Sequence, residues 1–181
     1  MIQFQFVLAS GWSSGLIQMF GGGTKTLGFS HVDILLPPGL VFGGKTVPVT
    51  GQLFGARSDE IGGKPAGVQR RPIGYGDKEW IRREIFALQS TPAQDKVFYG
   101  FLASQEGKPY DKTAIVAFAV DRDWRADDSW FCDELAAAAT EAAGVCPNLY
   151  LPANKLTPTG WAVVVSALGG IIRPQKVGVN A

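Results

Sequence analysis

The amino-acid sequence predicts an α+β fold formed by a single domain over residues 1–181. Patterns typical of strands occupy most of the first half, and patterns typical of helices occupy most of the second half. This order favours helices gathered against a small antiparallel sheet or barrel. Apolar residues make up 46% of the chain and aromatic residues 11%, which is enough to fill a hydrophobic core at this length.

The predicted strands are short runs rich in β-branched and aromatic residues. The clearest one covers residues 29–36 (FSHVDILL) and ends at the turn Pro37-Pro38-Gly39. Pro48 indicates an edge or a bulge in the next segment, because proline cannot donate to a strand ladder. Further strands are expected at residues 3–9, 47–56 and 68–71.

The helices are predicted from apolar residues that recur at intervals of three and four positions. They are expected at residues 13–20, 78–88, 92–105, 132–143 and 157–168. The fourth is rich in alanine and ends at Gly144, and the fifth has Pro158 in its first turn. The apolar run 113–120 (TAIVAFAV) fits either a buried helix or a strand.

The charge of the chain argues against a nucleic-acid partner. The formal net charge is +1, and the densest basic cluster, Arg70-Arg71 with Arg82-Arg83, is small. The N-terminal apolar run lacks the basic residues of a signal peptide, and the longest apolar stretch, residues 161–172, is too short to cross a bilayer. We therefore expect a soluble protein without a leader or a transmembrane segment, with a cytoplasmic location favoured and the oligomeric state open.

The most informative stretch is WFCDEL, where Cys132 falls at the start of a predicted helix. Free amides and the helix dipole at such a position stabilise a thiolate and lower its pKa, which suits a nucleophile. The neighbouring acids Asp133 and Glu134 suit the dipole but oppose an anion on the sulfur. By itself Cys132 is equally consistent with a small buried apolar residue. Cys146, in the loop after the helix, is interpreted as structural.

A cysteine nucleophile needs a base, and His31 is the only histidine of the chain. Alternation along the strand places His31 and Asp33 on one face, so Asp33 is a candidate to orient the imidazole. The alternative is a half-buried histidine hydrogen-bonded at a sheet edge. One histidine and no Cys-x-x-Cys pair leave a metal site short of ligands, so none is expected.

Three stretches together resemble the NlpC-like branch of the papain-fold cysteine peptidases and amidases. The stretch SHVDI (residues 30–34) resembles the histidine strand of that family, and GKPYD (107–111) resembles the segment that precedes its nucleophile. The stretch WFCDEL (130–135) resembles its nucleophile helix, in which serine more often follows the cysteine. The histidine precedes the cysteine here, which is similar to the circularly permuted group. That group includes uncharacterised bacterial hydrolases and relatives of lecithin:retinol acyltransferase.

The resemblance implies a permuted papain-like fold with its nucleophile at a helix N-terminus. It assigns Cys132 as nucleophile, His31 as base, and Tyr110 with the Cys132 backbone N–H as oxyanion donors. The family places a third polar residue on the strand after the histidine strand, where this chain has Gly55. Asp33 is the favoured substitute, and Gln52 is the alternative.

The implied activity is a cofactor-free hydrolase that cuts an amide or peptide bond, for example in a cell-wall peptide, through an acyl-enzyme. Two alternatives stay open. One is a lipid or ester acyltransferase, or a thioesterase, of the same fold. The other is a catalytically weak binding or assembly module, for instance one of phage origin.

Overall fold

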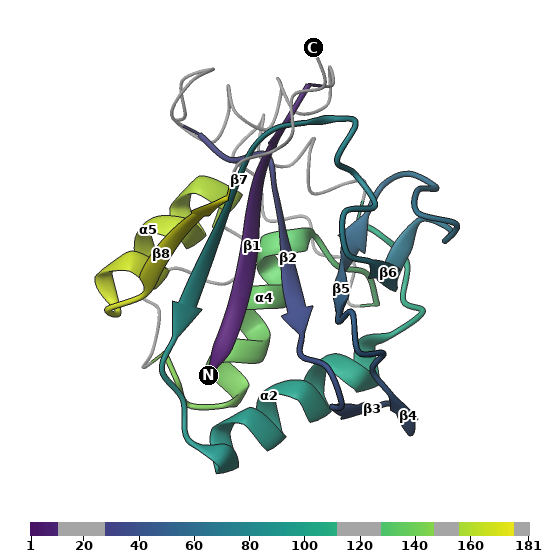
Figure 1. The fold of residues 1–181 in the computed structure, drawn as a ribbon. Helices are drawn as coiled ribbons and strands as arrows, with labels where there is room; N and C mark the ends of the chain where they lie inside the picture. The colour runs from purple at the N-terminus through teal and green to yellow at the C-terminus, as the bar shows by residue number, and fades with distance from the viewer. Residues whose placement is uncertain (11–27, 112–127, 147–155, 176–181) are drawn as a thin grey trace.

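The computed structural model describes residues 1–10, 28–111, 128–146 and 156–175 (Figure 1). Its centre is an open, six-stranded antiparallel sheet. The spatial order is β6 (Gly67–Pro72), β5 (Gln52–Arg57), β2 (His31–Leu36), β1 (Ile2–Ala9), β7 (Trp80–Leu88) and β8 (Ile171–Gln175). A separate hairpin joins β3 (Val41–Phe42) and β4 (Lys45–Thr46). The two outer strands of the sheet do not pair with each other, so the described strands form no closed barrel, which corrects that part of the sequence expectation.

Three helices accompany the sheet: α2 (Pro92–Gln105), α4 (Cys132–Ala142) and α5 (Pro158–Ala167). In Figure 1, α4 passes behind β1 and β2, α2 lies below the ends of the strands, and α5 lies beside β8. The start of α2 is fixed by a capping box, in which Thr91 and Gln94 each satisfy a backbone N–H of the other. The start of α5 is capped by Thr157, whose hydroxyl accepts from the backbone N–H of Gly160 at 3.1 Å. No helix of the described ranges has the length and apolarity that a membrane span requires.

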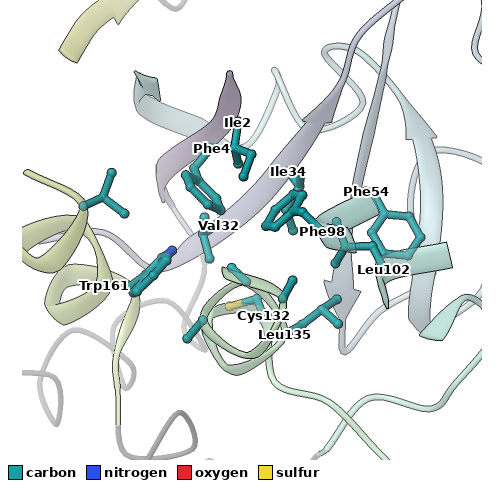
Figure 2. Close-up of a cluster of buried hydrophobic side chains, with 14 of the residues drawn as sticks. Ile2, Phe4, Val32, Ile34, Phe54, Phe98, Leu102, Cys132, Leu135 and Trp161 are labelled. Carbon is teal, nitrogen blue, oxygen red and sulfur yellow. The ribbon is translucent and has the colours of Figure 1, made fainter. Parts of the chain in front are cut away.

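The main core lies between the sheet and the helices. Figure 2 shows Val32 and Ile34 on the side of β2 that faces Cys132 and Leu135 of α4. The alanine-rich face of α4 buries small side chains, which allows the helix to approach the sheet closely. Large rings fill the remaining space, and they come from Phe4, Phe6, Phe54, Phe86, Phe98 and Trp161.

The opposite face of the sheet is also buried, but it mixes apolar and polar side chains. Val7, Leu53 and Trp80 form a small apolar cluster there. The side chains of His31 and Asp33 emerge from β2 on the same face as Val7, because Val7 pairs with His31. The sheet therefore separates an apolar core from a buried polar layer.

The strand predictions at 3–9, 29–36 and 68–71 match β1, β2 and β6, and the helices at 92–105, 132–143 and 157–168 match α2, α4 and α5.

The helix expected at 78–88 is wrong, because this segment is β7. It pairs with β1 along its whole length, from Ile2 opposite Leu88 to Ala9 opposite Trp80, and with β8 on its other side. Apolar residues at this spacing fit a strand with both faces covered as well as a helix. The predictions for 13–20 and 113–120 lie outside the described residues.

The helix-facing core can be tested at Trp161, which is fully buried and meets Phe4 edge to face with 5.7 Å between ring centroids. We expect Trp161→Ala to lower the free energy of unfolding by about 3–5 kcal/mol in urea titrations, because it leaves a large cavity. Val163→Ala is the control, since Val163 lies on the same helix but is 64% exposed. Its effect should stay within about 0.5 kcal/mol. Equal losses in the two variants would contradict this placement of α5.

Candidate active site

A polar cluster surrounds the only histidine at the start of β2. His31 Nε2 lies 3.0 Å from Asp33 Oδ1, and both side chains are almost completely buried. The Tyr75 hydroxyl donates to Asp33 Oδ2 at 2.7 Å and lies 3.2 Å from His31 Nε2. The approach of Nε2 to Oδ1 is a close polar contact without the alignment of a regular hydrogen bond. The structure thus brings the predicted base and the favoured third residue together.

Gly55 makes room for this arrangement. It lies on β5 beside Asp33, and a Cβ atom at position 55 would collide with Asp33 Oδ1. The carboxyl group therefore occupies the space that a side chain at position 55 would fill. The resemblance described above places its third polar residue at this position. In this chain the neighbouring strand supplies a carboxylate to nearly the same place.

The surroundings of Asp33 favour its ionised form. Burial alone would raise the pKa of this carboxyl. The charge and close approach of His31, the hydrogen bond from Tyr75 and the charge of Arg57 together outweigh that cost and lower the pKa below its usual value. Arg57 is itself held by a bidentate contact with Asp59, with distances of 2.8 and 2.7 Å.

Cys132 is the first residue of α4, as predicted, and it is 1% exposed. Its thiol donates to Asp133 Oδ1 at 3.5 Å. Burial, followed by the charge of Asp133, raises the pKa of the thiol well above its usual value, and backbone hydrogen bonding by Val32 opposes this only in part. The lowered thiol pKa expected from the helix start is therefore wrong, because burial disfavours the charged thiolate.

Asp133 is a fully buried carboxyl group in the first turn of α4. Its Oδ2 atom has no hydrogen-bond partner among the described residues. Burial raises its pKa well above the usual value, and the charge of Glu134 adds to this effect. A carboxyl and a thiol whose neutral forms are both favoured by burial therefore lie side by side at the start of the helix.

The thiol and the imidazole approach β2 from different faces. Cys132 packs in the same apolar cluster as Val32 and Ile34 (Figure 2), so alternation directs His31 and Asp33 to the other face. Among the described residues, no hydrogen bond joins the sulfur to His31. Backbone hydrogen bonding by Val32, the residue after His31, lowers the pKa of the Cys132 thiol, so the sulfur lies close to the β2 backbone.

Tyr110 lies near Cys132. Its backbone bridges that of Trp130, and its ring packs on Phe131 with 5.5 Å between centroids. Burial raises the pKa of Tyr110 well above its usual value, and the charges of Cys132 and Asp133 contribute to the rise. A protonated hydroxyl close to the thiol is consistent with the oxyanion role that the resemblance implies.

Gln52 lies far from the histidine. It begins β5 and pairs with Leu36, at the opposite end of β2 from His31. Cys146 is buried, and both cysteine thiols are free, so no disulfide joins them. Within the described ranges, no three His, Cys, Asp or Glu side chains gather in a way that could hold a metal ion.

Sequence reasoning missed Tyr75. This residue lies in the turn between β6 and β7, far along the chain from His31, and only the sheet brings the two together. Its one local signal is the Gly-Tyr-Gly triplet, which marks a tight turn without specifying what the tyrosine contacts.

No family model and no curated protein matches the chain. Among solved structures, it is similar to the metalloprotein yiiX from Escherichia coli O157:H7, a DUF1105 protein. The TM-score is 0.53 at 17% sequence identity, and the match covers 79% of this chain and 66% of that one. The chain thus spans slightly less than two thirds of the length of yiiX, and the likeness concerns the α+β fold alone.

The space beside Asp33 can be tested with Gly55→Ala. The new methyl group should displace the Asp33 carboxyl and lower the free energy of unfolding by about 1–3 kcal/mol, as overpacking of a core does. Gly100→Ala is the matched control, because a Cβ there meets nothing within 4 Å and the position is an exposed one in α2. That variant should gain up to about 1 kcal/mol from helix propensity. A neutral Gly55→Ala variant would contradict the packing described here.

The two buried carboxyls should give opposite pH dependences of stability. Asp133 has a raised folded pKa, so stability falls as pH rises above the unfolded value of about 3.9. Asp133→Asn should therefore be more stable than wild type at neutral pH, and the difference should vanish in acid.

Asp33 has a lowered folded pKa, so its stabilisation is present above about pH 3.9 and is lost as the pH falls through the folded value.

Asp33→Asn should accordingly be less stable than wild type at neutral pH, with the two proteins converging in acid. Denaturant titrations between about pH 3 and 7 measure both differences, in a range that spans the unfolded carboxyl pKa. Differences of the same sign for the two variants would refute the assignment of these environments.

Proposed function

We propose that the protein is a cysteine hydrolase with a circularly permuted, NlpC-type papain-like fold, acting on an amide or peptide bond. The observation that carries this proposal is the orientation of His31. Its Nε2 atom faces Asp33 and Tyr75, and among the described residues its Nδ1 atom has no hydrogen-bond partner. A carboxylate and a hydroxyl that hold the ring through one nitrogen fix its orientation, as a general base that acts through its other nitrogen requires.

The reaction begins from a neutral thiol, because the pKa of Cys132 is raised. Nδ1 of His31 takes the thiol proton as the sulfur attacks the substrate carbonyl, and an S–C bond forms. Tyr110 and the Cys132 backbone N–H donate to the oxyanion. The imidazolium then returns the proton to the leaving amine as the C–N bond breaks. Water, deprotonated by the same ring, attacks the thioester and releases the acid and the thiol.

This sequence requires the sulfur and Nδ1 to come within hydrogen-bond distance. Because the thiol packs among the core residues and the imidazole emerges from β2 on the face of Val7, the proposal includes a movement of the start of α4 or of β2 on substrate binding. The same acyl-enzyme chemistry also serves lipid, ester or thioester substrates. A peptide or another amide, such as a cell-wall peptide, is the substrate class that we favour.

A second candidate function is a non-catalytic binding or assembly module. The specific observation in its favour is the buried, neutral thiol of Cys132, which hydrogen-bonds Asp133 and not His31. In that case the His31–Asp33–Tyr75 cluster is a structural feature of the polar layer.

The two candidates are separated by covalent labelling with a peptidyl chloromethyl ketone, followed by peptide mass mapping. We expect labelling of the wild-type protein at Cys132, none in Cys132→Ala, and a rate lower by about 100-fold or more in His31→Ala, the usual contribution of a general base. Cys146→Ala is the matched control and should label like wild type. Labelling at Cys146, or an undiminished rate in His31→Ala, would support the binding module.

A further inference from the structure

The hydroxyl of Tyr75 lies between the imidazole of His31 and the carboxyl of Asp33. It is 2.7 Å from Asp33 Oδ2 and 3.2 Å from His31 Nε2. Since Asp33 is ionised, both of its oxygens can only accept, and the hydroxyl proton of Tyr75 is donated to Oδ2.

This donation determines the protonation of the imidazole. A phenol hydroxyl has a single proton, so once it is given to Asp33 the oxygen can only accept from His31. Nε2 must therefore carry a hydrogen. The 3.0 Å approach of Asp33 Oδ1 to the same nitrogen requires the same proton, because two acceptors at this distance would repel each other. In the neutral ring the lone pair then lies on Nδ1.

The position of Tyr75 is set by rigid contacts on several sides. Its ring packs edge to face on Trp80, with 5.3 Å between centroids, and the guanidinium groups of Arg57 and Arg71 lie 5.7 and 5.6 Å from its centroid. Gly62 has a φ of +64°, and a Cβ there would lie 2.8 Å from that of Tyr75, so the loop packs directly against this residue.

The hydroxyl also keeps its proton across the working pH range. Burial raises the pKa of Tyr75 well above its usual value, and the charge of Asp33 adds to this effect. Tyr75 thus remains a donor to the carboxylate wherever Asp33 is ionised.

We infer that Tyr75 is a positioning residue, which holds His31 in the tautomer with the proton on Nε2 and so leaves Nδ1 as the basic nitrogen. The effect of this tautomer on catalysis rests on the function proposed above. The opposite tautomer would present an N–H group to the thiol in place of the lone pair that a base needs. The tautomer itself is a property of the resting protein.

Nitrogen-15 NMR of the histidine ring tests this inference. The chain has one histidine, so every ring signal belongs to His31. At a pH where a titration shows the ring to be neutral, the wild-type protein should give the shifts of the Nε2–H tautomer. Tyr75→Phe should give averaged shifts from both tautomers. Tyr99→Phe removes the hydroxyl of another buried tyrosine, packed on Phe98 of α2, and should match wild type.

The catalytic readout is kcat/KM with a peptide ester substrate. Loss of one hydrogen bond to a charged group predicts a fall of about tenfold to 100-fold in Tyr75→Phe. The fall should appear in kcat and leave KM unchanged, whereas Tyr99→Phe should retain wild-type activity.

Two results would overturn the inference. One is a wild-type ring that carries its proton on Nδ1, and this result does not depend on any variant folding. The other is a Tyr75→Phe protein that keeps the wild-type ring shifts. A wild-type protein with the expected tautomer and no reaction at Cys132 supports the tautomer assignment and overturns the hydrolase. The two proposals therefore fail separately.

Discussion

The alternation of side chains along β2 is the constraint on which the rest of the structure depends. Val32 and Ile34 point into the core against α4, while His31 and Asp33 point into the polar layer on the other face. A shift of one residue in the pairing of β1 with β2 would exchange the two sets and bury both carboxyl and imidazole among aromatic rings. The pairing of Val7 with His31 and of Phe4 with Ile34 therefore determines the core and the candidate site together.

Burial acts on the two aspartates in opposite directions because their partners differ. Asp33 is surrounded by His31, Tyr75 and the charge of Arg57, and these offset the loss of water. Asp133 has a thiol and an unpartnered oxygen, so its neutral form is favoured. In the proposed hydrolase, the surroundings of Asp33 thus favour the ionised form that would orient His31, whereas those of Cys132 disfavour the thiolate. This asymmetry explains why the hydrolase proposal includes a movement of α4 or β2, and why a binding module remains the competing function.

Local signals predicted several elements well. The helices predicted at 92–105 and 157–168 match α2 and α5, where Thr91 and Thr157 cap the first turn and a proline follows each of them. The same local reasoning failed at residues 78–88, because the periodicity of apolar residues cannot distinguish a helix from a strand covered on both faces. Cys132 and His31 were proposed as site residues from their position and from the family resemblance, and Asp33 from strand alternation, which is a local property. Tyr75 was not, because its partners lie on a distant strand.

The sequence by itself determined the α+β class, the start of α4 at Cys132 and the shared face of His31 and Asp33, since each depends on neighbours within one element. Only the tertiary structure decided that Gly55 admits the Asp33 carboxyl, that Tyr75 meets both partners, and that the thiol lies on the other side of the strand from the imidazole. These relations arise from the register and packing of elements far apart in the chain. No local propensity specifies them, because their free energy comes from contacts that exist only once the sheet has formed.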